Sequence, residues 1–347
     1  MKNGYEIFIA DKNDSPAIKK LFEKTSYPHL IDLQFRRGDD SYRSFMAEDK
    51  GADIMLVKDT AADTIIGMGA CSYHDVLIDN EIKRGAYING LKILPEYQKR
   101  YITLLPSAIK SMFDLTMDKT DIYYATVLEQ AVSTQKTFEK KRSFMPVFDR
   151  QCTYTSFLFK PFRKTYGIEL EKGNVNGLDD FYEKNLCKYN FAPVTRHING
   201  ACDDDYITWR KNGKILAACV ILNNQSYKNY YLNGYNGIFR LISHLPTKLM
   251  GYPAFPKPGH SVDNVSLSML MFDESLTSKD KALFIKAASS YAADHDVVMT
   301  GIADNDPSYV AFNYIKHIKY SSILYTVNPG EIITANDRPI YIDVAFM

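Results

Sequence analysis

A predicted strand, a short loop and the start of a helix form a segment suited to bind a phosphate group. The apolar run from Gly85 to Leu94 predicts a strand that ends at Pro95, and apolar residues at helical spacing follow. The amino terminus of a helix offers unpaired backbone N–H donors and the positive end of the helix dipole, which together hold a diphosphate. Lys99 and Arg100 add positive charge beside it.

Few other residues are placed to move protons or to bind a metal. His74 stands next to Asp75 at the end of a predicted strand, and we consider it as a general base because histidine titrates near neutral pH. A surface His–Asp pair is the alternative interpretation. The seven histidines show no metal-ligand spacing, and the five cysteines form no Cys-x-x-Cys pair. We therefore expect no metal, no disulfide framework and a reducing, cytoplasmic location.

The segment Leu91–Thr103 resembles the cofactor loop of the GNAT superfamily of acyl-CoA-dependent N-acyltransferases. That loop carries a proline, then Gln/Arg-x-x-Gly-x-Gly/Ala before a helix. Gln98 matches the pattern, whereas Tyr101 and Thr103 replace the two glycines and crowd the approach of a phosphate. The resemblance implies that acetyl-CoA or another acyl-CoA binds here, and that its acyl group is transferred to an amine. The implied cofactor-binding residues are Ile93, Gln98, Lys99, Arg100, Tyr101, Ile102 and Thr103.

The resemblance also implies a tyrosine that protonates the leaving thiolate from the helix after the fifth strand. The first half of the chain has Phe138 at this position, which cannot donate a proton, and the counterpart in the second half is Tyr314. The base position falls near Tyr87 and Asn89, neither of which is a convincing base. The predicted catalytic residues are therefore Tyr314 and His74. Transfer would be direct attack of an amine on the thioester, with backbone N–H groups polarising its carbonyl.

The elements that position these residues occur twice along the chain. Tyr5–Ile9 has a counterpart in Tyr166–Leu170, and a gapless alignment lays Asn89–Phe144 over Val265–Tyr320. The sequence therefore predicts an α/β (α+β) fold of two tandem GNAT-like domains, each a mixed, mostly antiparallel central sheet flanked by helices. We assign residues 1–162 to the first domain and 163–347 to the second.

The second domain differs from the first at its cofactor loop. Phe272–Asp280 has no glycine and places two acids where an anion would lie. Thr277 and Asp280 have the spacing of a capping box, which occupies the free N–H groups of a helix start. We expect this copy not to bind CoA. Residues 236–264 form an insertion rich in proline and glycine, and Ile340–Val344 looks like a final strand.

Charge and hydropathy limit the partners. The chain has 347 residues, and 42 Lys+Arg against 41 Asp+Glu leave a net charge of +1. We therefore expect no nucleic-acid or membrane partner unless a local patch exists. The longest apolar run, Ile215–Leu222, is too short to span a bilayer. The expected acceptor is a small-molecule or peptide amine, and the oligomeric state stays open.

Two other functions compete with acyl transfer. The missing glycines and Phe138 are compatible with a non-catalytic sensor that keeps the fold and lacks the cofactor loop. A relative of the tRNA-dependent aminoacyl ligases, which are also tandem GNAT-like proteins, would need a basic surface for tRNA. The net charge of +1 and the lack of a long Lys/Arg cluster count against that alternative.

Overall fold

A computed structural model of the protein describes residues 4–25, 30–140, 145–164, 166–328 and 337–347, without the side chains of 99–103. The strands are β1 (Tyr5–Ile9), β2 (Ile31–Arg36), β3 (Ala52–Asp59), β4 (Thr64–Ile78), β5 (Glu81–Ile93), β6 (Ile122–Leu128), β7 (Val147–Phe159), β8 (Leu170–Lys172), β9 (Ala192–Pro193), β10 (Tyr206–Lys211), β11 (Lys214–Leu222), β12 (Asn229–Tyr235), β13 (His260–Ser261), β14 (Asn264–Phe272), β15 (Val297–Ala303) and β16 (Ile318–Asn328). The α-helices are α1 (Ser15–Lys24), α2 (Ser41–Met46), α3 (Gln98–Thr116), α4 (Val132–Glu139), α5 (Leu178–Leu186), α6 (Phe239–Ile242) and α7 (Ser278–Ala288).

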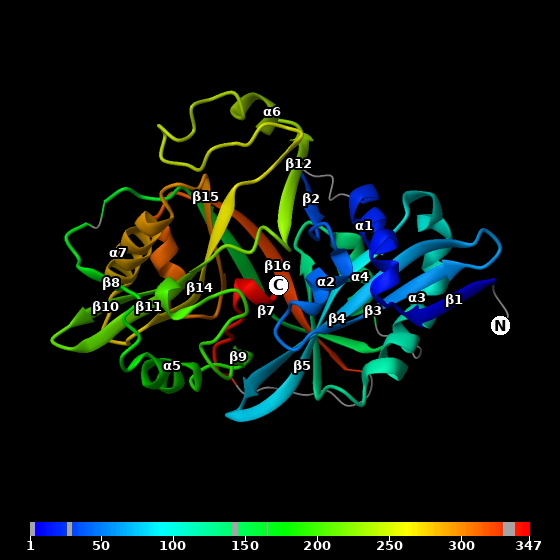
Figure 1. The fold of residues 1–347 in the computed structure, drawn as a ribbon, viewed down its shortest axis with the longest axis horizontal. Coiled ribbons are helices and arrows are strands. Elements are labelled where there is room, and N and C mark those ends of the chain that lie inside the picture. Colours follow the sequence, from blue (N-terminus) through cyan, green and yellow to red (C-terminus); the bar gives the residue numbers. More distant parts are fainter. Residues whose placement is uncertain (1–3, 26–29, 141–144, 165, 329–336) are drawn as a thin grey trace.

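One continuous sheet runs through both halves of the molecule (Figure 1). Its strand order is β1-β3-β4-β5-β6-β16-β7-β15-β14-β11-β10-β8, and β9 pairs with β4 off this path. Neighbouring strands are antiparallel except for β5–β6 in the first half and β14–β15 in the second. The expected mixed, mostly antiparallel sheets flanked by helices are confirmed, and the two are joined edge to edge.

The join is an exchange of strands between the halves. β16 belongs to the second half in sequence and pairs with β6 of the first half. β7 belongs to the first half and pairs with β15 of the second. β16 and β7 also pair with each other along most of their lengths, which places the pair at the centre of the sheet. Each half therefore completes its sheet with a strand from the other.

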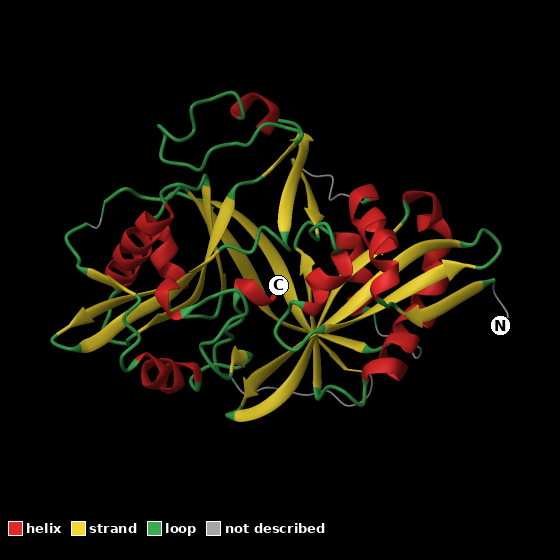
Figure 2. Ribbon diagram, in the orientation of Figure 1, coloured by secondary structure: helices red, strands yellow, loops and turns green. Residues whose placement is uncertain are grey.

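Helices cover both faces of the sheet in each half, as Figure 2 shows. In the first half, α1 and α2 pack through Leu21, Phe22 and Phe45 on one face, and α3 packs through Ile109 and Phe113 on the other. In the second half, α5 and α7 cover the two faces in the same way. Amphipathic spacing in α1 and α3 explains this two-sided core, because each helix buries one apolar stripe.

Tight turns join two of the antiparallel strand pairs. Asn212 and Gly213 both have positive φ between β10 and β11, as a two-residue type I′ turn requires. Asp79 and Asn80 adopt the same conformation between β4 and β5.

A second, three-stranded sheet joins the halves on one side. Its order is β13-β12-β2, so β2 of the first half pairs with β12 of the second. The sequence pattern did not predict β2. The insertion that follows β12 carries α6 and projects beyond this sheet at the top of Figure 1.

Three sequence expectations are wrong in detail. The strand expected at Tyr166–Leu170 begins only at Leu170, because Tyr166 and Gly167 both have positive φ and form a turn. Ile340–Val344 is buried but forms only an isolated bridge from Ile340 to Asn190. The gapless alignment of the halves does not pair Gly90 with Met269, although the bulges at these two residues, described below, are structurally equivalent.

No helix in the described part of the chain has both the length and the hydrophobicity that a membrane-spanning segment requires.

Candidate acyl-transfer site

The candidate site lies where the sheet of the first half opens. β5 and β6 pair over Gly85–Ile88 and Ile122–Ala125, and beyond these residues β6 continues to Leu128 paired only with β16 on its other edge. Gly90 has a φ of +60°, and the register between β4 and β5 shifts at this point, which defines a bulge. A Cβ on Gly90 would lie 3.3 Å from Cζ of Phe45. Both the backbone conformation and the lack of space therefore favour glycine at the bulge.

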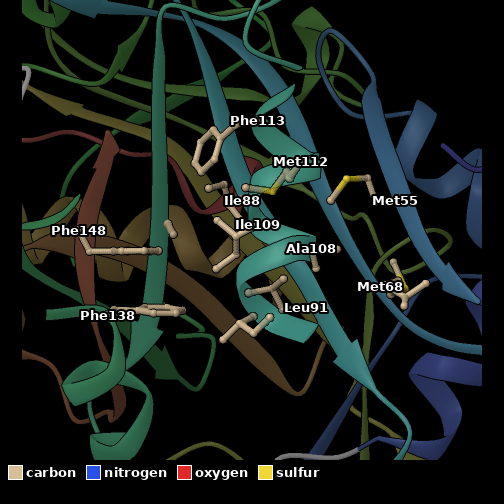
Figure 3. A pocket seen from close by; sticks show the side chains of 14 residues that line it. Met55, Met68, Ile88, Leu91, Ala108, Ile109, Met112, Phe113, Phe138 and Phe148 are labelled. Carbon is tan, nitrogen blue, oxygen red and sulfur yellow. The ribbon is translucent and has the colours of Figure 1, made fainter. Parts of the chain in front are cut away.

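An apolar pocket lies beside this opening, between the sheet and helices α3 and α4 (Figure 3). All its lining residues are apolar: Met55, Val57, Met68, Gly69, Ile88, Leu91, Leu105, Ala108, Ile109, Met112, Phe113, Ala125, Phe138 and Phe148. The cavity volume is about 30 Å³, whereas a water molecule needs roughly 10–15 Å³ on the same measure. The pocket as it stands accommodates a group of a few atoms, and its three methionines can adapt to a larger one.

The start of α3 lies at the end of β5, as the sequence predicted. Ile93 is half-buried at the last position of β5, a turn follows at Pro95–Tyr97, and Gln98 is exposed at the first position of α3. The residue before the helix, Tyr97, makes no side-chain hydrogen bond to the first-turn N–H groups. The side chains of Lys99, Arg100, Tyr101, Ile102 and Thr103 lie outside the described residues.

The helix start in the second half that corresponds to the start of α3 is capped by its own side chains. Thr277 accepts a hydrogen bond from the N–H of Asp280, and the Asp280 carboxylate accepts one from the N–H of Thr277. The predicted capping box is therefore confirmed. At the start of α7, the N–H groups of Thr277 and Asp280 are therefore bonded to side chains of the helix itself.

The equivalent bulge in the second half is occupied as well. Met269 in β14 has a φ of +50°, and its N–H donates to a carboxylate oxygen of buried Asp343. The hydroxyl of Tyr182 donates to the Met269 carbonyl over 2.6 Å. Burial raises the pKa of Asp343, although the N–H groups of Ala345 and Met269 oppose this effect. The final segment of the chain thus fills the bulge at Met269, and this carboxylate has no counterpart bonded to Gly90 among the described residues.

The predicted acid positions lie in different surroundings. Phe138 of α4 is buried at the edge of the apolar pocket and stacks on Phe148, with ring centroids 4.1 Å apart. Tyr314 ends a 3₁₀ helix in the second half, is 45% exposed and does not line the pocket. Tyr314 therefore lies in the second half and outside the lining of the apolar pocket, and its role stays a prediction.

A buried polar cluster lies on the opposite face of the sheet, at the junction of the halves. Glu48 forms ion pairs with Arg37 and, over 3.2 Å, with Lys228 of the second half. Burial raises the pKa of Glu48, but the charges of Arg37 and Lys228 outweigh it and lower that pKa to about 2. Burial lowers the pKa of Lys228, and Glu48 opposes this effect. Lys228 also donates to the carbonyl of Ala345 and to a backbone oxygen of Met347.

The cluster extends toward the bulge through two side chains. The hydroxyl of Ser72 lies beside Glu48 and helps to lower its pKa. The amide of Asn89, next to Gly90, donates to Oγ of Ser72 over 2.8 Å. The amide oxygen of Asn89 is buried and, within the described residues, accepts no hydrogen bond. Polar groups therefore run from the junction of the halves to the opening in the sheet.

His74 belongs to this cluster and does not pair with Asp75. Its Nδ1 lies 3.8 Å from Asp49, its ring packs on Phe346, and neither ring nitrogen has a hydrogen-bond partner in the described structure. His74 lies opposite Gly85, whereas Ala70 lies opposite Asn89. Four positions along β4 amount to about 13 Å. His74 is therefore too distant to take a proton directly from a group at the bulge.

Sequence reasoning missed the bulge and the ionic cluster. The Asn89-Gly90 pair inside a strand pattern is a signal for a bulge, and it was available from residue type alone. No local pattern could connect Glu48 with Lys228, because their contact depends on how the halves pack.

Among the described residues, no group of three or more histidine, cysteine or acidic side chains is arranged to hold a metal.

Comparisons with known proteins show which fold this is. No family model matches the chain, and no curated protein matches its sequence. Saccharomyces cerevisiae N-myristoyltransferase with bound myristoyl-CoA superposes with a TM-score of 0.62 at 10% identity, over 94% of this chain and 83% of that one. The GCN5-related glucosamine N-acetyltransferase region of a fungal multi-domain GH3 β-N-acetylglucosaminidase gives 0.59 at 13% identity, over 93% of this chain and 38% of that one. The chain therefore has the GNAT fold of the N-acyltransferases.

Proposed function

We propose that the protein is an N-acyltransferase that moves an acyl group from acyl-CoA to an amine, and that its first half holds the thioester. The observation that carries this proposal is the contrast between two equivalent bulges. Gly90 lies at an opening beside an apolar pocket, whereas Met269 is bonded to Asp343. The likeness in fold to an N-myristoyltransferase and to an N-acetyltransferase region supports the same reaction class.

The pocket favours a short acyl group. Acyl-CoA would enter along the opening between β5 and β6, with its pyrophosphate at the start of α3 and its acyl group near the bulge. A cavity of about 30 Å³ accommodates an acetyl group, and a longer chain requires α3 or the surrounding methionines to move. We therefore expect acetyl-CoA to bind more tightly than long-chain acyl-CoA.

The reaction needs no covalent enzyme intermediate. The neutral amine attacks the thioester carbonyl carbon, the new C–N bond forms, and the C–S bond breaks to release the CoA thiolate, while the proton lost by the nitrogen passes to water or to that thiolate. Backbone N–H groups at the bulge would stabilise the negative charge that develops on the carbonyl oxygen. A thiol with a pKa near that of cysteine, about 8.5, leaves as a thiolate without a strong general acid, so Phe138 is compatible with catalysis.

The acceptor amine would approach from the face that carries the polar cluster. Asn89 lies next to the bulge, and its free amide oxygen is placed to accept a hydrogen bond from the attacking amine. Ser72 and Glu48 continue this path toward the junction of the halves. At a distance of about 13 Å, His74 could receive the proton of the amine only through intervening groups.

Charge reversal at the start of α3 tests the cofactor site. We expect Lys99→Glu/Arg100→Glu to weaken acetyl-CoA binding at least about 30-fold, because the loss of two cationic groups that each contribute roughly 1 kcal/mol costs about 2 kcal/mol, and the new carboxylates repel the polyanion further. Isothermal titration calorimetry with acetyl-CoA, and separately with a long-chain acyl-CoA, measures the effect.

The matched control reverses two exposed lysines of the second half, Lys211→Glu/Lys279→Glu. We expect this variant to bind acetyl-CoA as the unmodified protein does. If the unmodified protein binds neither thioester at millimolar concentration, the transferase proposal fails and the non-catalytic sensor becomes the better account. Equal losses in the two variants would instead indicate a nonspecific charge effect.

Tyr314→Phe tests which half holds the thioester. If the first half holds it, we expect kcat to stay within about twofold, because Tyr314 lies in the other half and does not line the pocket. A loss of about 100-fold or more, the range of general acid catalysis, would show that Tyr314 protonates the leaving thiolate as the sequence predicted. Release of CoA in the presence of a panel of amines provides the measurement.

A further inference from the structure

The insertion after β12 differs in charge from the rest of the chain. No aspartate or glutamate occurs from Tyr206 to Val262, although the whole chain is close to neutral. Within the insertion, Arg240, Lys248 and Lys257 are exposed. Two lysines from outside it also contact it: Lys160 donates to the carbonyl of Lys248, and Lys316 donates to that of Met250. Lys248 is paired with Asp296 over 2.6 Å, which leaves Arg240 and Lys257 as the main source of positive charge on this surface.

The same surface exposes large apolar side chains. They lie on α6 and the loop after it, and their exposed fractions are unusually high: Ile238 62%, Leu241 71%, Leu245 50%, Leu249 87% and Met250 52%. Leu30 of the first half is 40% exposed and lies against Gly237. A contiguous set of this kind marks an interaction site, whereas single exposed apolar residues are ordinary.

The insertion is held in place from beneath, so the exposed side chains are presented outward. Tyr235 donates to the carbonyl of Pro256, and Thr247 donates to that of Pro253. The ring of Phe255 packs on both Tyr235 and Phe239. The aromatic residues of the insertion thus form its internal packing, and the leucines remain on the outer side. In Figure 1 this segment projects from the body of the molecule.

We propose that this apolar and basic surface, formed by Ile238–Met250 with Leu30 and the surrounding lysines, docks onto a bilayer that contains anionic phospholipid. Leucine side chains that insert into the headgroup boundary, flanked by lysine and arginine, are the features of an interfacial membrane segment. A basic residue near an anionic bilayer strengthens binding about fivefold, which corresponds to about 1 kcal/mol. Because the segment contains no acids, its charge is complementary to that of an anionic bilayer. It is not complementary to that of a neutral or basic protein.

Vesicle co-sedimentation tests the proposal with the full-length protein. We expect binding to phosphatidylcholine vesicles that contain 30% phosphatidylglycerol, and at least about tenfold weaker binding to pure phosphatidylcholine. Leu241→Ser/Leu245→Ser/Leu249→Ser should weaken binding at least tenfold at every salt concentration. Arg240→Glu/Lys257→Glu should weaken it about 30-fold at low salt, and less at high salt, because screening removes the charge contribution.

Matched controls separate a specific surface from general stickiness. Ile82→Ser/Met117→Ser/Val132→Ser removes three residues of the first half that are 50–63% exposed, and it should bind vesicles as the unmodified protein does. All these positions are exposed, and unchanged near-ultraviolet circular dichroism would show that the variants fold. Lack of binding to the anionic vesicles, or unchanged binding of the leucine variant, overturns the proposal. A dimer that the leucine variant converts to a monomer, without vesicle binding, would assign the surface to a second copy.

Discussion

Replacing Gly90 with alanine is expected to lower kcat/KM for acyl transfer at least about 100-fold. An L residue in this left-handed conformation costs roughly 1–2 kcal/mol, and its Cβ would lie 3.3 Å from Phe45 and 3.5 Å from Met68. β5 can relieve this strain by moving the bulge. A displacement of about 1 Å at the reacting carbonyl is sufficient for a 100-fold loss of rate. Steady-state release of CoA with the best amine of a panel measures the change.

Gly51→Ala is the matched control for Gly90→Ala. Gly51 lies in the same half with a φ of +77°, but a Cβ there would meet no atom within 4 Å. Both variants should lose a similar free energy of unfolding in urea, because both strain the backbone. Only Gly90→Ala should lose activity. If the two variants keep equal activity, the bulge does not position the thioester.

Replacing Glu48 with glutamine is expected to remove about 3–5 kcal/mol from the free energy of unfolding at pH 7. Removing one partner of a buried ion pair leaves the other charges uncompensated. In this protein, the uncompensated charges would be those of Arg37 and Lys228. Each of these side chains is no more than 5% exposed. Urea unfolding monitored by tyrosine and tryptophan fluorescence measures the change.

The effect should depend on pH in a defined direction. The pKa of Glu48 is about 2 in the folded protein, against an ordinary value of 4.5. A carboxyl group with a depressed folded pKa stabilises the fold above its unfolded pKa, and this contribution is lost as the pH falls from about 4.5 to 2. The shift corresponds to roughly 3 kcal/mol. The difference in unfolding free energy between the unmodified protein and Glu48→Gln should therefore narrow from pH 5 to pH 3.

Glu81→Gln provides the comparison for this pH dependence. Glu81 pairs with Lys83, and its pKa is lowered by that bond, but the pair is exposed. Exposed ion pairs contribute little to stability, so this variant should unfold almost as the unmodified protein does at every pH. A pH-independent difference for Glu48→Gln would mean that packing, and not charge, explains its loss of stability.

Local signals predicted the elements of the fold better than their pairing. Thr277 with Asp280 located a helix start, because a capping box depends on a few adjacent residues. The pairing of β16 with β6 joins segments almost 200 residues apart. Both strands contain apolar and β-branched residues, and nothing in that composition distinguishes one partner strand from another.

The candidate site was predictable to a similar degree. The loop after Pro95 and the aromatic replacement at Phe138 are visible in the sequence, and the structure places Phe138 at the pocket. Asp343 was hidden within a segment that reads as a strand. Its carboxylate fills the second bulge only because the end of the chain passes between the halves, near the centre of Figure 1. Contacts of this kind depend on tertiary packing and not on spacing.

The exchange of β7 and β16 also sets an order for biosynthesis. On its edge away from β5, β6 pairs with β16, which leaves the ribosome almost 200 residues later. At about 5–20 residues per second, the nascent first half waits roughly 10–40 s for that strand. During this interval it carries an unpaired β6 edge or a provisional pairing with β7, and an unpaired edge of this kind is open to association with other chains. Chaperone contact with the nascent chain is therefore expected to concentrate between the synthesis of β6 and the arrival of β16.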